Sequence, residues 1–362
     1  MRILTVNVGS SSVKLSVFDD DDLIDKVALE SDRGLLNELE VKNAITAHLP
    51  IDAVGHRVVH GGSEFTGPVA IDDHVRRRLE ALVDLAPLHL PVSLAGIDLV
   101  SHLLPEAPAV ACFDTAFHAH LPAAAATYAL PIEWRRRWQL RRYGFHGLSH
   151  AWAAQRTAAL YGRPVDSLRI VTCHLGAGAS LAAVAYGSSV DTTMGFTPLE
   201  GLVMATRSGS VDPGLLLWLE EHAGLPPAEL ASTLERRSGL LALAGTSDMQ
   251  KVLDCEADGD PDATLALDVY VHRLCAQASA MVAAMGGLDA LVFTGGVGEN
   301  AAPIRLRAAT GLGFLGVAVD EARNDTATPD AELTKDGAAV RTFVVEARED
   351  LQIEREVRTV VI

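Results

Sequence analysis

The apolar residues of this chain fall into short uninterrupted runs, separated by stretches with helical spacing. The runs that predict strands cover 3–8, 13–18, 168–174, 181–186, 290–294 and 340–345. The stretches whose apolar positions recur with helical spacing cover 75–85, 215–221, 263–285 and 302–310. Because predicted strands alternate with predicted helices, the pattern indicates an α/β architecture. The helix over 263–285 is apolar nearly all round, so we expect it to be buried between layers.

Two predicted hairpins share a turn rich in glycine and serine. The first hairpin spans 3–18 with its turn at Gly9–Ser12, and the second spans 168–186 with its turn at Gly176–Ser180. Backbone N–H groups and hydroxyls in such turns can hold a phosphate. The two hairpins start about 165 residues apart, which predicts a duplicated fold with one phosphate-binding hairpin in each half.

A third glycine-rich segment follows the strand predicted over 290–294. It reads Gly295–Asn300 and leads into the helix predicted over 302–310. A strand, a glycine-rich loop and a helix in this order commonly place a phosphate or a nucleoside at the start of the helix.

Composition narrows the class of protein. The chain has 362 residues, which favours about two domains, and its formal net charge is −17. Such an acidic chain is a poor candidate for binding nucleic acid or an anionic membrane surface. Its four cysteines form no CxxC pair, no apolar run approaches ~18 residues, and the N-terminal run is too short for a signal peptide. We therefore expect a cytoplasmic protein with no nucleic-acid or membrane partner.

Polar clusters that interrupt apolar segments carry the candidate chemistry, since P-loop, HExxH and GxSxG motifs are absent. Lys14 follows the first turn and could contact a phosphate, or it could be an exposed hairpin lysine. Arg57, beside glycines, suits bidentate capture of a carboxylate or phosphate, although a surface arginine is the simpler alternative. Asp114 follows an apolar run and could orient a nucleophile or cap a helix. Glu349 and Asp350 could be an exposed acidic pair at a helix start.

The clusters occur in an order that resembles one known family. The segments are NVGSSSVK at 7–14, GHRVVHGG at 55–62, APLHLP at 86–91, FDTAFH at 113–118, RRYGFHGLSH at 141–150, TCHLGAGAS at 172–180, DTTMGFTPLEG at 191–201, TRSGSVDPG at 206–214 and TGGVGEN at 294–300. Each is weak alone, but together they cover nearly the whole chain. In this respect the sequence is similar to the acetate and propionate kinases, which belong to the actin/hexokinase/Hsp70-like phosphotransferases.

The resemblance implies a fold and a reaction. The fold is α/β, a duplicated actin-like ATPase (ribonuclease H-like) fold with two domains flanking an active-site cleft. The domains would be 1–116 with about 350–362, and 117–349. The reaction would be reversible transfer of the ATP γ-phosphoryl group to acetate, giving acetyl phosphate and ADP by direct in-line transfer with Mg²⁺ or Mn²⁺. A homodimer is also implied.

The resemblance further implies roles for single positions. The catalytic residues would be Asp114, His146 and Arg207. The carboxylate of the substrate would contact Arg57, and its methyl group would contact Val59, Leu88 and Pro198. The metal would contact Asn7 and Glu349. The nucleotide would contact Lys14, His174, Leu175, Gly176, Ala177, Gly178, Asp248, Met249, Gln250, Gly296, Val297, Gly298, Glu299 and Asn300. Because Arg57 and Arg207 would line the cleft, we expect the protein to fold without either of them.

Three positions depart from the family pattern. Ala177 stands where the second phosphate loop usually has asparagine, and Gln250 stands where the family usually has arginine. Both belong to the nucleotide site, so they predict weaker and less selective binding of the phosphoryl donor. Leu90 replaces an asparagine beside the predicted acyl pocket.

Three alternative functions remain. The enzyme could prefer propionate or another short-chain carboxylate. The same fold could bind nucleotide with impaired catalysis. A third alternative is a metal-dependent hydrolase built on the histidines His118, His120, His146 and His150.

Overall fold

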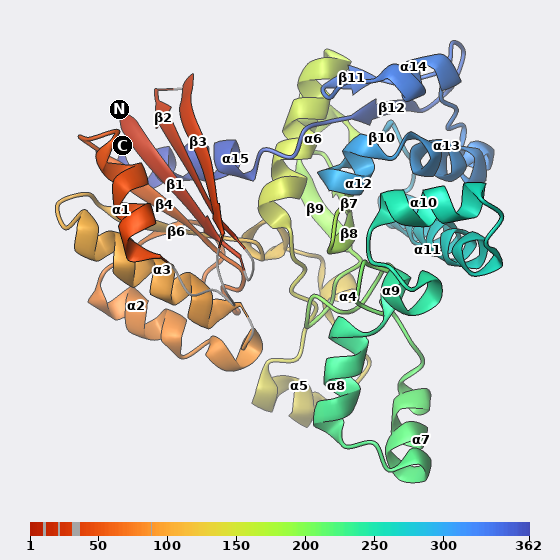
Figure 1. Ribbon diagram of the computed structural model, residues 1–362, viewed down its shortest axis with the longest axis horizontal. Helices are drawn as coiled ribbons and strands as arrows, with labels where there is room; N and C mark the ends of the chain where they lie inside the picture. The colour runs from red at the N-terminus through yellow and green to blue at the C-terminus, as the bar shows by residue number, and fades with distance from the viewer. Residues whose placement is uncertain (10–11, 21, 31–36, 88) are drawn as a thin grey trace. The chain divides into compact units, whose positions relative to one another are not determined.

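The computed structural model describes residues 1–9, 12–20, 22–30, 37–87 and 89–362 (Figure 1). Its described residues divide into two compact units. The first unit comprises Met1–His120, Phe145–Trp152 and Arg348–Ile362, and the second comprises Leu121–Gly144 and Ala153–Ala347. None of the described helices has the length and hydropathy needed to span a lipid bilayer.

The sheet of the first unit has six strands. Their order is β3 (Asp22–Glu30), β2 (Ser12–Asp19), β1 (Arg2–Val8), β4 (Ala53–Val58), β6 (Ala109–Phe113) and β5 (Val69–Ala70). The central strands β1, β4 and β6 run parallel, and the other neighbours pair antiparallel. The helices of this unit are α1 (Glu38–Thr46), α2 (Asp73–Glu80), α3 (Leu90–Leu103) and α15 (Glu349–Val361).

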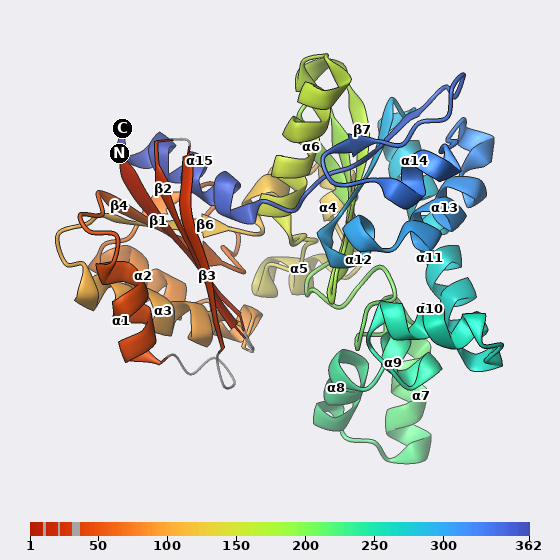
Figure 2. The same cartoon turned by 45° about the horizontal axis from the view of Figure 1, so that its top comes forward.

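Side chains on both faces of the central strands β1, β4 and β6 are buried, because helices cover both faces of the sheet there. Leu4 and Val6 of β1 share a core with Val41 of α1 and Val100 of α3. Ile3, which points the other way, shares a core with residues of α15. Figures 1 and 2 show α15 on one side of the sheet and α1 and α3 on the other. Strands buried on both faces form near-continuous apolar runs, which is the pattern the sequence has here.

The sheet of the second unit repeats this topology. Its order is β9 (Ser188–Thr192), β8 (Ala179–Ala185), β7 (Arg169–Leu175), β10 (Ala290–Thr294), β12 (Arg341–Val344) and β11 (Ala331–Glu332). Here too the three central strands are parallel and the other neighbours are antiparallel. The same order with the same directions in both sheets confirms the predicted α/β fold and its duplication.

The remaining helices belong to the second unit, except that the start of α6, up to Trp152, belongs to the first unit. They are α4 (Ala123–Ala126), α5 (Ile132–Trp138), α6 (Gly147–Tyr161), α7 (Pro213–Ala223), α8 (Pro227–Arg236), α9 (Gly239–Ala244), α10 (Met249–Ala257), α11 (Pro261–Met285), α12 (Gly295–Asn300), α13 (Ala302–Gly311) and α14 (Glu321–Thr326). The helix predicted over 263–285 is α11, but the expectation that it is buried between layers is wrong. It buries one face, with Leu267 and Leu274, and exposes 55% of Leu265 on another.

Glu356 on α15 is a carboxyl group in an unusual setting. Its Oε1 accepts a hydrogen bond of 3.1 Å from Gln352 Nε2, and the helix packs against β4, β1 and β6. Burial raises the pKa of Glu356 to about 7, against the lowering effect of hydrogen bonds from Gln352 and Cys112. The native protein therefore holds a proton here at pH values where the unfolded chain has lost it.

Glu356→Gln should stabilise the protein at pH 8 and change little at pH 5. The folded-state pKa lies above the unfolded value of 4.5, so the wild-type free energy of unfolding falls as the pH rises from about 4.5 to about 7. The loss above pH 7 is at most about 3 kcal/mol, and glutamine, which does not ionise, avoids it. Urea unfolding at both pH values measures the difference, with exposed Glu133→Gln as the control. An equal effect of Glu356→Gln at the two pH values would contradict it.

Candidate active site

Four of the predicted site residues lie at one edge of the first sheet. Asn7 is the penultimate residue of β1, Arg57 is the penultimate residue of β4, and Asp114 directly follows β6. Glu349 is the first residue of α15. Because β1, β4 and β6 are parallel neighbours, their carboxyl ends meet at the same edge, which is where α/β sheets usually bind ligands.

Hydrogen bonds join these four side chains into one cluster. Arg57 Nε donates to Asp114 Oδ1 at 3.0 Å, and Arg57 Nη2 donates to Asp114 Oδ2 at 2.6 Å. Arg57 Nη1 donates to Asn7 Oδ1 at 3.1 Å, and Asn7 Nδ2 donates to Glu349 Oε2 at 3.1 Å. The side chain of Asp114 is 1% exposed, whereas that of Arg57 is 18% exposed. The cluster thus fixes a guanidinium group whose outer side reaches solvent.

The charges in the cluster act on one another. Burial raises the pKa of Asp114, the ion pair with Arg57 opposes this rise, and the charge of Glu349 adds to it. Burial alone would lower the pKa of Arg57, but Asp114 and Glu349 raise it above its usual range. Arg57 therefore stays charged at every pH at which the protein is folded, and Asp114 is a stronger base than an exposed aspartate.

His146 lies in the turn that precedes α6, beside the Asp114 segment. Its φ angle is +57°, in the left-handed region that few residues other than glycine adopt. The Gly147 N–H donates to the Asp114 carbonyl oxygen at 2.8 Å, and a Cβ on Gly147 would lie 2.3 Å from that oxygen. On the other side, His118 Nε2 lies 3.1 Å from the carbonyl oxygen of Phe145. The half-buried His146 side chain is therefore held by its neighbours on a constrained backbone.

The other predicted residues of the first unit lie near this edge or outside the described chain. Lys14 pairs with Asn7 across the β1–β2 hairpin, and its side chain is exposed. Val59 directly follows β4 and is buried. Leu88 lies outside the described residues. Leu90, which departs from the family pattern, is fully buried in a core with Val58 and Phe113.

The part of the chain that the structure describes contains no set of metal ligands that would support the metal-hydrolase alternative. There, no group of three or more histidine, cysteine, aspartate or glutamate side chains could hold a metal ion. His118 and His150 are both buried, with ring centroids 5.7 Å apart in an edge-on contact. Burial lowers the pKa of His118 to about 4, so this imidazole is neutral at physiological pH.

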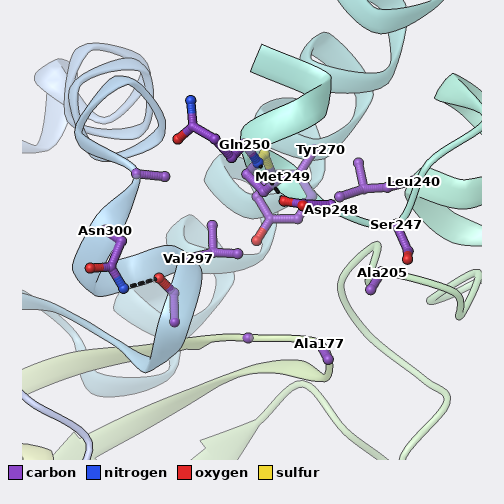
Figure 3. A pocket seen from close by; sticks show the side chains of 13 residues that line it. Ala177, Ala205, Leu240, Ser247, Asp248, Met249, Gln250, Tyr270, Val297 and Asn300 are labelled. Atoms are coloured by element: carbon purple, nitrogen blue, oxygen red, sulfur yellow. Dashed lines mark hydrogen bonds between the residues drawn. The ribbon is translucent and has the colours of Figure 1, made fainter. Parts of the chain in front are cut away.

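The second unit contains a cavity of about 370 Å³ (Figure 3). Three segments predicted to bind nucleotide meet in it. Its predicted lining residues are Gly176, Ala177, Asp248, Met249, Gln250, Gly296, Val297 and Asn300. The volume lies within the range of about 300 to 1,000 Å³ that is usual for small-molecule pockets.

Local hydrogen bonds shape the segments around the cavity. The Gly176 N–H donates to the Gly178 carbonyl oxygen at 3.0 Å and closes the turn between β7 and β8. Asp248 Oδ1 accepts from the Gln250 N–H at 3.0 Å and caps α10. The Gln250 side chain donates to Asp254 Oδ1 at 2.9 Å, so its amide lies along its own helix, directed away from Ala177 in Figure 3.

Not all predicted nucleotide residues line this cavity. His174 and Leu175 belong to β7, and Gly298 and Glu299 belong to α12. Glu299 Oε1 accepts from the Gly295 N–H at 2.9 Å and from the Ala347 N–H at 3.0 Å. Burial raises the pKa of Glu299, although these two N–H groups oppose the rise. Glu299 is therefore placed to hold α12 in position.

Arg207 and Pro198 lie close together in the second unit. Arg207 Nη1 donates to the Pro198 carbonyl oxygen at 3.0 Å. Among the described residues Arg207 forms no ion pair, and burial lowers its pKa. Backbone hydrogen bonds from Ser208 to Leu234, and from Ser238 to Thr206, fix the segment on either side of it. The structure thus holds a half-buried cation that forms no ion pair within that part of the chain, although the charge of Glu235 partly opposes the lowering of its pKa.

The sequence patterns did not identify five further residues around the cavity. These are Ala205, Leu240, Ser247, Tyr270 and Ala301. Tyr270 had a usable signal, because it places a phenol hydroxyl on the buried face of α11, which is otherwise apolar. The hydroxyl is buried without a hydrogen-bond partner among the described residues, and burial raises the pKa of Tyr270 above its usual value.

Comparison with known proteins places this geometry in a family. The model of the Acetokinase family matches residues 25–355. The chain belongs to the acetokinase family. It is 50% identical over 308 residues to an acetate kinase of Gloeobacter violaceus, covering 84% of this chain and 76% of that one. It is 39% identical over 388 residues to an acetate kinase of Bacillus cytotoxicus, covering 98% of each.

Solved structures of the acetokinase type have the same fold as this chain. The acetate kinase of Porphyromonas gingivalis has a TM-score of 0.91 and 36% identity, with all of both chains covered. A propionate kinase of Francisella tularensis has a TM-score of 0.92 and 34% identity, covering 99% of this chain and 100% of that one. The chain is therefore similar to the same degree to a solved acetate kinase and to a solved propionate kinase.

Proposed function

We propose that this acetokinase-family chain is an acetate kinase, which reversibly transfers the γ-phosphoryl group of ATP to acetate and gives acetyl phosphate and ADP. Its acetate kinase relatives, up to 50% identical over most of the chain, support the assignment. The observation that carries it is the buried Arg57–Asp114 pair, joined to Asn7 and Glu349 where three parallel strands end. This arrangement offers a fixed cation to one anionic substrate.

The chemical difficulty is electrostatic. A carboxylate and a polyphosphate repel each other, and the transition state spreads negative charge over the equatorial oxygens of the transferred group. We assign Arg57 to the carboxylate of acetate, and Arg207 and His146 to the transferred phosphoryl group. Val59, Leu88 and Pro198 would contact the methyl group.

Asp114 is better suited to positioning than to nucleophilic attack. Both of its carboxylate oxygens accept hydrogen bonds from Arg57, and its side chain is buried. An attacking carboxylate would have to leave this bidentate pair. We therefore favour direct in-line transfer without a covalent enzyme intermediate, with Asp114 holding Arg57 in place.

The residues at the strand ends fit a divalent cation. Asn7 Oδ1 and the Glu349 carboxylate are oxygen donors of the kind that Mg²⁺ and Mn²⁺ prefer, and in this structure they accept hydrogen bonds from Arg57 and from Asn7. Mg²⁺ commonly takes only one or two protein ligands and completes its shell with water and substrate phosphates, so two side chains suffice. When bound, the ion would neutralise charge on the phosphate oxygens. We assign the cavity of the second unit, together with Lys14, to the nucleotide.

The function is tested by measuring acyl phosphate directly as its hydroxamate. The purified chain with ATP and acetate should form hydroxamate in the presence of Mg²⁺ and not after chelation of divalent ions. Comparison of kcat/KM for formate, acetate, propionate and butyrate should rank acetate first. One methylene is worth only about 1 to 3 kcal/mol in an apolar pocket, so the ranking needs all four acids. Nucleotide binding without acyl phosphate would contradict the assignment and favour the impaired alternative.

We further propose a cytoplasmic homodimer. All four cysteines are free, as is usual in a reducing compartment. Helix α7 reads PGLLLWLEEHA, yet none of its residues is buried, and Leu217 and Trp218 are 62% and 53% exposed. Near its C-terminal end α7 carries the acidic pair Glu220 and Glu221. Helix α5, in contrast, is basic and exposes two tryptophans, Trp134 and Trp138. Two copies related by a two-fold axis could pack α5 of one on α7 of the other, with opposite charges facing.

Leu217→Glu and Trp218→Glu should shift the protein from dimer to monomer. Each places a charge in the apolar centre of the proposed interface, where it would lose its hydration on association. Light scattering coupled to gel filtration gives the mass directly. The matched control is Phe314→Glu, since Phe314 is 75% exposed on a different helical turn, Gly313–Leu315. A monomeric wild type, or a dimer that both α7 variants leave intact, would contradict the proposal.

A further inference from the structure

Arg305 on α13 is among the largest fully buried side chains of the molecule. It is 2% exposed, and within the described residues no carboxylate forms an ion pair with it. Burial lowers the pKa of Arg305, and the nearby charge of Asp325 opposes this effect. A buried charge without a partner is expensive, so its hydrogen bonds must be favourable ones.

The Arg305 guanidinium caps the end of helix α12. Its Nη1 donates to the carbonyl oxygens of Gly298, at 3.0 Å, and Glu299, at 2.7 Å. Carbonyl groups in the last turn of a helix lack partners within the helix and carry its partial negative charge. A cation at this place therefore satisfies two such groups and stabilises the short helix.

The opposite edge of the guanidinium is fixed by Asn324 of α14. Arg305 Nε donates to Asn324 Oδ1 at 2.8 Å, and Arg305 Nη2 donates to the Asn324 carbonyl oxygen at 2.7 Å. The fully buried Asn324 in turn donates from Nδ2 to the Ala302 carbonyl oxygen at 2.9 Å. Arg305 and Asn324 thus tie the end of α12, the start of α13 and α14 together.

Helix α12 forms one wall of the cavity in the second unit. Gly296, Val297 and Asn300 line that cavity (Figure 3). The helix has only six residues, too few to be stable without support, and two glycines stand in its first turn. The Glu299 side chain accepts a hydrogen bond from the first N–H group of the helix, that of Gly295. Arg305 donates to the carbonyl oxygens of Gly298 and Glu299 near its end. The orientation of this wall therefore depends on two side chains that do not themselves line the cavity.

We propose that Arg305 is a positioning residue for the nucleotide, acting with Asn324 by holding α12 in the conformation that ATP binds. This inference rests on the proposed function, because it takes the cavity to be the nucleotide site. Arg305 touches no reacting atom. Its loss should weaken ATP binding and leave the acetate site unchanged, since the proposed acetate residues lie on other segments.

The test uses Arg305→Met and Arg305→Lys in the full-length protein. Arg305→Met should raise both the calorimetric Kd and the KM for ATP by about 10- to 100-fold, as expected for a lost hydrogen bond to a charged group. The KM for acetate should stay within about twofold. Arg305→Lys keeps the positive charge and can reach the carbonyl oxygens of Gly298 and Glu299, but it lacks the planar guanidinium group. Its affinity for ATP should therefore lie between those of Arg305→Met and the wild type.

Arg307→Met is the matched control. Arg307 is two residues further along α13 and forms a bidentate pair with Glu256, with distances of 2.9 Å and 2.6 Å. Its side chain is 36% exposed, and it contacts neither α12 nor α14 through these bonds. Arg307→Met should therefore leave the ATP constants unchanged, which separates the effect at Arg305 from a general effect of losing an arginine on α13.

The possible outcomes separate this inference from the proposed function. A wild type that binds no ATP and forms no acyl phosphate contradicts the function itself. If the wild type is active, two results would overturn the inference. The first is that folded Arg305→Lys and Arg305→Met bind ATP as tightly as the wild type. The second is that the KM values of these variants for ATP and for acetate rise together. If Arg305→Met does not fold, the Lys variant decides, with Asn324→Ala as a second variant that removes the Oδ1 acceptor of Arg305 Nε and the donor to Ala302. Wild-type ATP affinity in both would overturn the inference.

Discussion

Arg207→Ala should lower kcat by about 10³-fold or more, by analogy with arginines that stabilise a transferring phosphoryl group. The structure supports a large effect, because Arg207 is half-buried, donates to the Pro198 carbonyl oxygen and forms no ion pair within the described residues. Its charge is therefore available for an incoming anion. Steady-state kinetics measure the change, and exposed Arg237→Ala, on the C-terminal side of α8, is the control. A variant with unchanged kcat would remove Arg207 from the mechanism.

Arg57→Ala should lower kcat by a similar factor and also raise the KM for acetate, since Arg57 would contact the carboxylate in the ground state. Contrary to the expectation that the protein folds normally without Arg57, we now expect this variant to be less stable than the wild type. Asp114 is 1% exposed, and removing Arg57 would leave this carboxylate buried and unpaired. Breaking a buried pair in this way typically costs about 3 to 5 kcal/mol.

The destabilisation and the loss of activity at Arg57 can be separated. The double variant Arg57→Ala with Asp114→Asn removes the charge that Arg57 leaves behind, so it should recover much of the lost stability. It should not recover activity, because the cation is still missing. Thermal unfolding and the hydroxamate measurement report the two quantities independently. Recovery of activity in the double variant would show that Arg57 acts only on folding.

The parts of the fold that the sequence predicted depend on local patterns. The hairpins at 3–18 and 168–186 were visible as paired β-type runs around glycine-rich turns, and both are present as β1–β2 and β7–β8. The strand and the helix at either end of 290–310 were visible for the same reason, and both are present as β10 and α13. The glycine-rich loop predicted between them is wrong, because Gly295–Asn300 forms the short helix α12. These signals are local. The spacing of apolar residues indicates a strand or a helix, and glycines indicate where the chain turns.

Features that depend on distant pairs were not predictable in detail. Asp114 was identified as a candidate, but nothing local showed that both of its oxygens meet Arg57, 57 positions earlier. The grouping of Phe145–Trp152 with the first unit likewise depends on contacts such as Gly147 with Asp114. Arg305 was missed because an arginine in a helix usually faces water, and its burial depends on Asn324, 19 positions away.

The two departures from the family pattern at the nucleotide site predict weak binding of ATP and relaxed selection among purine and pyrimidine triphosphates. Ala177 is exposed at the cavity and offers no side-chain hydrogen bond there. Gln250 lines the cavity, but its amide is bound to Asp254 at 2.9 Å. A missing neutral hydrogen bond costs about 0.5 to 1.5 kcal/mol, and one to a charged group costs about 1.5 to 3 kcal/mol.

Ala177→Asn combined with Gln250→Arg should therefore lower the KM for ATP by about 10- to 10³-fold, with kcat and the KM for acetate largely retained. Gln250→Arg should contribute the larger part because it adds a charge. Part of that gain would be lost to an ion pair with Asp254, four residues further along α10, so adding Asp254→Asn should lower the KM further. Kinetics with ATP, GTP, CTP and UTP measure affinity and selectivity together. An unchanged KM for ATP in the double variant, or a wild type that already binds ATP tightly and discriminates sharply among bases, would show that other residues compensate for Ala177 and Gln250.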